Sequence, residues 1–341
     1  MDVNTDLAMW SNQLIVSAMI VYAVAMIFSA FDLFGGRELK KSKSDTVAAG
    51  AKSSTVRRTN RKTATALLDR PGADDHAGDN GTGEELSASD AKRRRAARIG
   101  TSLIVLAVVL HIGSVITRTL SVMRVPWGNM MEYVLTATAI TVLVYLIVLT
   151  RKDIRYLGTF VSGGVLLCLG LAITVFYTPA AQLIPALDSY WIAIHVPIAI
   201  LSTALLSISA ILAVFQILKT VSETKDPKWL RFMRRLPSST ELERFSYTIA
   251  AVGFITWTFT LIAGAIWAEV AWSRYWGWDT KEIWTFVVWV VYAAYLHARA
   301  TRGWGPTKVA VLNLIGIATV FFNFTVVNVY FNGLHSYSGL G

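Results

Sequence analysis

The stretch GAIWAEVAWSRYWGWDTKEIW, residues 264–284, decides how this sequence is interpreted. It holds five tryptophans, one tyrosine and a single aspartate between two long apolar runs. Tryptophan rings often anchor helix ends at a membrane–water interface, but anchoring takes one or two rings at each end. Several rings in one loop, interrupted by Gly277 and ending in Trp278 and Asp279, predict an aromatic platform instead. Such a surface suits a large planar ligand.

The apolar runs on either side of this stretch predict an integral membrane protein. Of the 341 residues, 54% are hydrophobic, and the mean hydropathy is +0.49. A bilayer core is crossed by roughly 20 apolar residues in a helix, because lipid offers no partner to unpaired backbone groups. We therefore expect an all-α fold with about eight transmembrane helices. They fall near residues 9–33, 100–121, 130–150, 157–177, 191–219, 245–268, 282–299 and 309–330.

Clusters of lysine and arginine orient these spans. They occur in 35–98, 151–155, 219–244 and 299–308, which all fall on one side of the membrane if the chain crosses it eight times. Loops rich in Lys and Arg stay in the cytoplasm. Both termini and the tryptophan-rich loop are therefore expected outside, in a multi-pass protein of a bacterial plasma membrane. The net charge of +10 then reflects topology. We expect no nucleic-acid partner, and binding of the basic segment to nucleic acid or anionic lipid is the alternative.

The composition divides the chain into three segments. Residues 1–34 hold an N-terminal transmembrane helix that lacks the basic start of a cleavable signal peptide. Residues 35–98 are rich in Ser, Thr, Ala, Gly and charge, and are predicted to be a disordered basic cytoplasmic linker. Residues 99–341 form the transmembrane core. Cys168 is the only cysteine, so the chain cannot perform dithiol chemistry by itself.

Four histidines outside the linker are the second indication of function. His111 and His297 fall inside predicted spans, whereas His195 and His335 lie near the outer ends of others. Ionisable groups inside a bilayer are costly and often functional, and histidine is a common axial ligand of haem iron. For any one of them a satisfied core histidine is an equal alternative. Their grouping by depth predicts two bis-histidine sites. Zinc is the weaker alternative, since no thiol or carboxylate stands at metal-site spacing.

Taken together, the sequence resembles the CcsA/ResC-type membrane proteins of system II cytochrome c synthesis, often called CcsB in actinobacteria. The resemblance covers roughly residues 100–341 and rests on a tryptophan-rich WWD signature. The signature is matched by Trp267, Trp272, Tyr275, Trp276, Trp278, Asp279, Lys281 and Glu282. Ser273 and Thr280 depart from it, where glycine and proline are usual. Further matching stretches are PWGNMMEY (126–133), HVPIAILS (195–202), YLHAR (295–299) and NVYFNGLHSY (328–337).

The resemblance implies iron ligands for two haem b molecules. His195 and His335 would ligate one haem beside the tryptophan-rich loop. His297 would ligate a second haem within the membrane, and its other ligand would be His111 or a histidine from a partner protein. These residues would then form the WWD domain, the haem-handling core of the protein.

The resemblance also implies a haem environment. Trp267, Trp272, Trp276 and Trp278 would bind the cofactor and offer apolar surface to the porphyrin. Asp279 would orient an indole, a backbone amide or a substrate histidine, and it also has the position of a helix N-cap. Three arginines expected on the outer side could pair with haem propionates or, equally, with neighbouring protein groups; they are Arg118, Arg124 and Arg274.

The function implied is that of a membrane component of holocytochrome c synthase, a cytochrome c haem-lyase. It would move haem to the outer face and present it for thioether attachment to the CxxCH motif of apocytochrome c. Its partners would be a Ccs1/ResB-type membrane protein, apocytochrome c and a thiol-reducing thioredoxin-like protein. No catalytic nucleophile is expected in this chain, because the substrate supplies the thiols. The alternatives are a haem exporter without synthase activity and a haem-bearing electron-transfer membrane subunit.

Overall fold

The computed structural model describes residues 3–35, 80–183, 185–301, 303–331 and 333–335. Over these ranges the chain is helical and contains no strand. The helices are α1 (Thr5–Phe34), α2 (Asn80–Val122), α3 (Met130–Leu149), α4 (Gly158–Thr174), α5 (Trp191–Lys225), α6 (Ser239–Trp272), α7 (Thr280–Ala300), α8 (Pro306–Phe324) and α9 (Val326–Tyr330). Short 3-10 turns occur at η1 (Arg155–Leu157), η2 (Pro185–Leu187) and η3 (Lys228–Arg235).

Eight segments of the described chain are long and apolar enough to cross a membrane. They are Thr5–Phe34, Ala91–Val122, Met130–Leu149, Arg155–Thr174, Trp191–Lys225, Ser239–Trp272, Thr280–Ala300 and Pro306–Tyr330. The prediction of an all-α membrane protein with about eight spans is therefore confirmed. The helices overrun several predicted spans because their polar ends remain helical beyond the apolar windows.

The predicted disordered linker, residues 35–98, falls mostly on residues 36–79, which lie outside the described ranges. Within the described chain, α2 already begins at Asn80 and continues without a break into its membrane span. Residues 84–98 consist largely of Ala, Arg, Lys and Glu, which favour helix. The helical region therefore starts before the predicted boundary of the core at residue 99.

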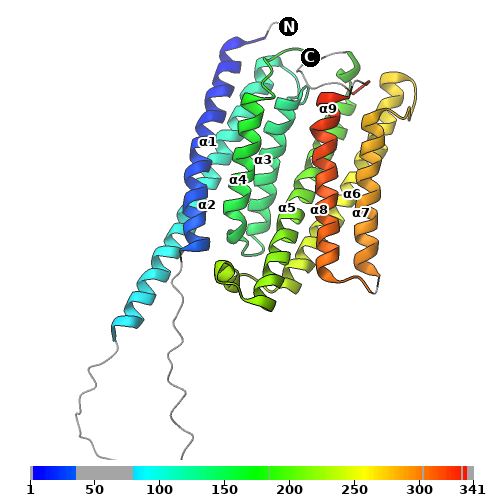
Figure 1. The fold of residues 1–341 in the computed structure, drawn as a ribbon. Coiled ribbons are helices and arrows are strands. Elements are labelled where there is room, and N and C mark those ends of the chain that lie inside the picture. Colours follow the sequence, from blue (N-terminus) through cyan, green and yellow to red (C-terminus); the bar gives the residue numbers. More distant parts are fainter. Residues whose placement is uncertain (1–2, 36–79, 184, 302, 332, 336–341) are drawn as a thin grey trace, which may run out of the picture.

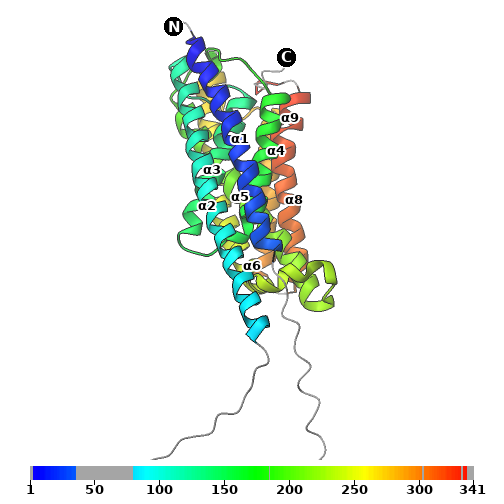
Figure 2. The same ribbon diagram turned by 90° about the vertical axis from the view of Figure 1, so that its left-hand side faces the viewer.

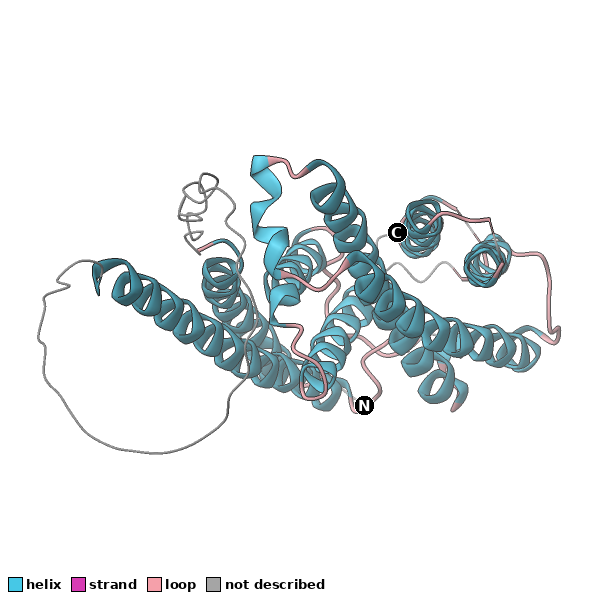
Figure 3. Cartoon of the chain, turned by 90° about the horizontal axis from the view of Figure 1, so that it is seen from below, coloured by secondary structure: helices cyan, strands magenta, loops and turns pink. Residues whose placement is uncertain are grey.

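The helices stand side by side, with α1 and α2 at one edge of the bundle and α6 and α7 at the opposite edge (Figures 1 and 3). Figure 2 shows the same bundle from the side of α1. Two hydrophobic clusters hold it together, and α5 belongs to both. Ile208 and Leu212 pack in the cluster with α1–α4, whereas Leu206 and Ala210 pack in the cluster with α6–α8. Helix α5 therefore joins the two halves.

Buried polar side chains join α5, α6 and α8 at one point. The hydroxyls of Ser209 and Ser246 each donate to the other residue's carbonyl oxygen, at 2.8 and 2.9 Å. The Asn313 amide donates to both hydroxyls, at 2.8 and 3.1 Å. Interhelical hydrogen bonds of this kind stabilise membrane bundles, so they fix the helices that surround the site described below.

The connection between α6 and α7, residues 273–279, is called the aromatic loop here. It lies at the same end of the bundle as the start of α1 and the end of α9, whereas η3 and the α7–α8 connection lie at the other end (Figure 1). The basic residues of η3 and the α7–α8 connection therefore share one end of the bundle. The assignment of these ends to the outer and cytoplasmic sides of the membrane stays a prediction.

The two departures from the WWD signature occupy the two ends of the aromatic loop. Ser273 follows α6 in the left-handed conformation, with φ 55° and ψ 34°, and its N–H donates to Glu269 O at 2.8 Å. A left-handed residue with a Cβ costs roughly 1–2 kcal/mol, and glycine avoids most of this cost. Thr280 is the first residue of α7, a position where proline is favoured. The backbone therefore explains why glycine and proline are usual here.

Replacing Ser273 with glycine is expected to raise the free energy of unfolding by about 1 kcal/mol, because it relieves the left-handed strain. Thermal unfolding in detergent measures the change. Ser207→Gly is the matched control, because Ser207 lies within α5 and glycine there should lower stability by roughly 0.5–1 kcal/mol. A Ser273→Gly protein destabilised as much as Ser207→Gly would contradict the assigned backbone conformation.

Candidate functional site

A cavity lies beneath the aromatic loop, between α3, α5, α6, α7 and α8. It encloses about 1370 Å³ of empty space, part of which is open to solvent. The walls come from segments far apart in the sequence, from Trp127 before α3 to His335 after α9. Of the residues predicted to bind haem, five line it: His195, Trp267, Trp272, Trp276 and His335. The cavity is therefore the place where the predicted outer site comes together.

His195 projects into this cavity from the first turns of α5. Its ring meets Trp267 edge-on, with centroids 5.6 Å apart and planes at 64°. Gly264 leaves the space for it, because a Cβ there would come within 2.9 Å of His195 Cε1. The Nδ1 atom is buried without a hydrogen-bond partner. A buried polar atom without a partner is costly. A ligand in the cavity that bonded to His195 would remove this cost.

His335 reaches the same cavity from the C-terminal side of α9 and is held by two contacts. Its Nδ1 lies 2.8 Å from Asp279 Oδ2, and its ring packs edge-on against Trp272 at 4.6 Å. Donation from Nδ1–H to the carboxylate assigns the lone pair to Nε2, as in carboxylate–histidine–metal arrangements. Burial lowers the pKa of His335 below its ordinary value, although the hydrogen bond to Asp279 opposes that shift. The neutral form, which binds metals, is therefore favoured.

Asp279 connects the aromatic loop, α7 and His335. Its carboxylate accepts from the Lys281 N–H, and Glu282 Oε2 accepts from the N–H groups of Asp279 and Gly277 at 3.0 and 2.8 Å. These bonds form a capping box. Asp279 Oδ1 also accepts from Leu334 N at 3.3 Å. The N-cap role and the orienting role expected for Asp279 thus coexist, and the group that it orients within the chain is the His335 imidazole.

The tryptophans do not form one flat platform. Trp267, Trp272 and Trp276 line the cavity, whereas Trp278 does not and is 72% exposed. Trp278 has a left-handed backbone, with φ 60°, and meets Trp276 edge-on at 5.9 Å. Its ring therefore lies outside the predicted surface.

Further aromatic residues also line the cavity, although the sequence alone did not indicate a role for them. Trp127, Tyr133 and Trp257 line the cavity from the α2–α3 connection, α3 and α6. Trp127 lies in PWGNMMEY, a stretch that the resemblance singled out without a role. Its Nε1–H donates to Thr136 Oγ1 at 3.2 Å. Trp257 falls inside an apolar span, where one more aromatic residue carries no signal in the sequence.

The inner pair of histidines does not meet within this chain. His111 is fully buried in α2, where its Nδ1 lies 3.4 Å from the Tyr22 hydroxyl of α1. His297 is exposed on α7, with Nε2 3.4 Å from Thr301 Oγ1. Helices α2 and α7 stand at opposite edges of the bundle (Figures 1 and 3), and neither histidine lines the cavity. The fold therefore does not bring these two side chains together.

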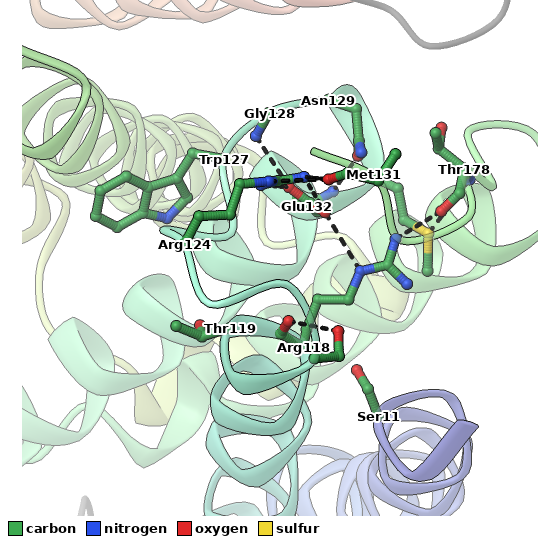
Figure 4. Close-up of polar contacts among 12 residues, drawn as sticks. Ser11, Arg118, Thr119, Arg124, Trp127, Gly128, Asn129, Met131, Glu132 and Thr178 are labelled. Carbon is green, nitrogen blue, oxygen red and sulfur yellow. Dashed lines mark hydrogen bonds and ion pairs between the residues drawn. The ribbon is translucent and has the colours of Figure 1, made fainter. Parts of the chain in front are cut away.

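Arg118 and Arg124 converge on the buried carboxylate of Glu132, as Figure 4 shows. Arg118 Nε lies 3.3 Å from Glu132 Oε1, and Arg124 Nη1 lies 2.9 Å from Oε2. Arg118 also donates to Thr178 O at 2.6 Å, and Arg124 to Ala181 O at 2.9 Å. Both arginines thus pair with protein groups, one of the two alternatives expected for them. Together with Gly128 N, which donates to Glu132 at 2.9 Å, they fix the loop that carries Trp127.

The fold and this cavity define an all-helical, multi-pass membrane protein with two histidines and a wall of tryptophans at one end. The family model for cytochrome C assembly proteins matches residues 127–335, which is more than half of the chain and includes every residue of the cavity named above. The chain therefore belongs to the cytochrome c assembly protein family, the membrane components of cytochrome c biogenesis.

Similar proteins agree with this family. The chain is 35% identical to the cytochrome c biogenesis protein CcsA of Chlamydomonas reinhardtii over 223 residues, 64% of this chain and 58% of that protein. It is 37% identical to CcsA of Guillardia theta over 175 residues, 47% of this chain and 58% of that protein. The chain thus spans less than two thirds of these relatives. The solved structure of cytochrome c heme lyase CcmF shares the fold, with a TM-score of 0.60 at 14% identity, covering 95% of this chain and 47% of that one.

Glu132→Gln is expected to destabilise the protein by roughly 3–5 kcal/mol, because it leaves the buried guanidinium of Arg118 and the half-buried guanidinium of Arg124 without a counter-charge. Thermal unfolding in detergent measures this loss. The control is Asp153→Asn, which breaks an exposed pair with Arg155 and should cost at most about 1 kcal/mol. Equal losses in the two variants would show that the buried pairing contributes no more than a surface pair.

Asp279→Ala should increase hydrogen exchange in two places, because the first turn of α7 loses its cap and His335 loses its acceptor. The cap alone contributes about 1 kcal/mol. Asp279→Asn keeps a good N-cap but replaces the carboxylate, so exchange should rise near residues 333–335 while α7 stays protected. If exchange near residues 333–335 stays unchanged in both variants, His335 is held by something other than Asp279.

Proposed function

We propose that this chain is the membrane component of a holocytochrome c synthase that holds haem b in the cavity and presents it to apocytochrome c. The observation that carries the proposal is that His195 and His335, which are far apart in the sequence, line one tryptophan-walled cavity. Bis-histidine ligation between them would hold the iron and set its redox state.

The chemistry of the cavity fits haem better than a bare metal ion. Among the described residues, no group of three or more His, Cys, Asp or Glu side chains could hold a metal ion. Two imidazoles suffice for a haem, because the porphyrin supplies the other four ligands. Trp267, Trp272 and Trp276 would cover porphyrin surface, and burial of rings of this size contributes a few kcal/mol.

Haem is the substrate of the proposed reaction, and this chain positions it. Each thiol of a reduced CxxCH motif adds across one vinyl group, so that sulfur bonds to one vinyl carbon and the hydrogen goes to the other. Nothing leaves, and no nucleophile from this chain is needed. Cys168 lies in α4 and does not line the cavity. Orientation of the two reactants is then the main contribution to rate.

The partners in this proposal follow from what the chain lacks. The CxxCH thiols belong to apocytochrome c and must be reduced, which calls for a thioredoxin-like thiol reductant on the outer side. His297 is exposed on α7 and has no histidine opposite it within the described chain. A Ccs1/ResB-type membrane protein would therefore complete a second haem site at His297, in place of His111. The complex would reside in a bacterial, specifically actinobacterial, plasma membrane.

His195→Ala and His335→Ala are each expected to reduce covalent haem attachment by at least about tenfold, equivalent to about 1.4 kcal/mol of lost binding. The assay co-expresses the full chain, its partner and a reporter c-type cytochrome, and measures covalent and total haem. Added imidazole should restore part of the yield by filling the vacant iron position. Trp276→Ala should also lower the yield, with Trp229→Ala at the other end of the bundle as control.

The same assay separates the proposed synthase from the haem exporter. An exporter would deliver haem to the outer side without attaching it. In that case the His195 and His335 variants would lower total haem, whereas covalent attachment of haem would continue by another route. Normal holocytochrome in both histidine variants would overturn the proposed function. Equal losses in Trp276→Ala and Trp229→Ala would leave the cavity wall without a specific role.

A further inference from the structure

Among the described residues, Lys281 is the one lysine or arginine that lines the cavity. The two arginines considered first for the outer end, Arg118 and Arg124, do not reach it, because both are bound to Glu132 and to carbonyl oxygens. Arg274 lies against Gly277 in the aromatic loop and is not part of the cavity wall. Lys281 is therefore the one cation in the described cavity wall that an anionic group of a ligand could meet.

The position of Lys281 is fixed from both sides. Its backbone lies in the capping box at the start of α7, and its Nζ donates to the main-chain oxygen of Asn323, near the end of α8, at 2.8 Å. An ammonium carries three donor hydrogens, so one holds α7 to α8 and two are available to a ligand. The charge is thus held in place before any ligand arrives.

No carboxylate of the described chain forms an ion pair with this ammonium. The Asp279 oxygens accept from His335, Leu334 and the Lys281 backbone. Glu282 also lines the cavity; its Oε2 accepts two backbone N–H groups, and its Oε1 is buried without a hydrogen-bond partner. A half-buried cation without a counter-ion is costly, and a carboxylate brought by the ligand would remove that cost.

A second donor lines the same cavity. The Nε1–H of Trp267 is buried without a hydrogen-bond partner. Lys281 and Trp267 belong to α7 and α6, so they approach the cavity from different walls. Two unused donors, one of them charged, match the oxygens of a carboxylate better than any neutral group, because charge-assisted bonds are roughly twice as strong as neutral ones.

We propose that Lys281 forms a carboxylate-binding subsite of the cavity. The inference rests on the proposed function, in which the ligand is haem and the carboxylate is one of its propionates. A propionate anchored at Lys281 fixes the rotation of the porphyrin about its iron. The edges that carry the vinyl groups then keep one position relative to the rim, where thiols would approach.

The test compares haem with its dimethyl ester, in which both propionates are uncharged. The full chain, purified without haem, is titrated with each porphyrin while the Soret band is followed. The wild-type protein should bind haem about tenfold or more tightly than the diester, a difference of about 1.4 kcal/mol. Lys281→Gln should remove this preference and leave diester affinity unchanged, because glutamine can still donate to Asn323 O.

Two further variants complete the experiment. Lys281→Arg should retain the preference for haem, because it retains the charge. Arg274→Gln should also retain it, because Arg274 lies outside the cavity wall.

The outcomes separate the inference from the function on which it rests. A Lys281→Gln protein that still prefers haem by the wild-type factor overturns the carboxylate subsite and leaves the proposed function standing. A variant that binds neither porphyrin overturns it too, because Lys281 would then act only by holding α7 to α8. A wild-type protein that binds neither porphyrin overturns both proposals. Equal binding of the two porphyrins by the wild-type protein overturns the subsite alone.

Discussion

The carboxylate of Asp279 is the point on which the candidate site depends. It ends the aromatic loop, starts α7 and holds His335 by a 2.8 Å hydrogen bond. Without it, the C-terminal histidine would lose its acceptor, and the loop would lose the closed hydrogen-bond ring that Glu282 completes. One side chain therefore couples helix initiation, a local event, to the convergence of residues that are distant in the sequence.

What the sequence could predict follows from which interactions are local. Hydropathy acts over about 20 residues, so the eight spans and the basic connections were predictable, and so was the N-cap of α7. The convergence of His195 and His335 in one cavity is a tertiary contact, and only their similar depth and the family resemblance pointed to it. Depth in the membrane suggested pairing His111 with His297, but depth does not say which helices are neighbours. Trp278 has a positive φ and an exposed ring, neither of which a sequence pattern reveals.

The cavity belongs to both halves of the bundle. Helix α5 packs into two hydrophobic clusters and places His195 in the cavity wall. One wall comes from α6 and the aromatic loop, and the other from Tyr133 and Trp127, whose loop is fixed by the buried Glu132. The polar contacts among Ser209, Ser246 and Asn313 hold α5, α6 and α8 together farther down. Buried polar contacts therefore hold the helices around the site in place, while Trp278 of the aromatic loop stays exposed.

The pairing of Arg118 and Arg124 with Glu132 also constrains how the chain enters a membrane. In the predicted topology these two arginines end on the outer side, so they cross the hydrocarbon layer during insertion, against the usual retention of positive charge inside. Glu132 lies only 14 residues after Arg118 in the chain, at the start of the next helix. Translocation of α2 and α3 as a paired hairpin would carry two positive charges and one negative charge across together. Biogenesis of the protein would then proceed by helical pairs at this step and not by single spans.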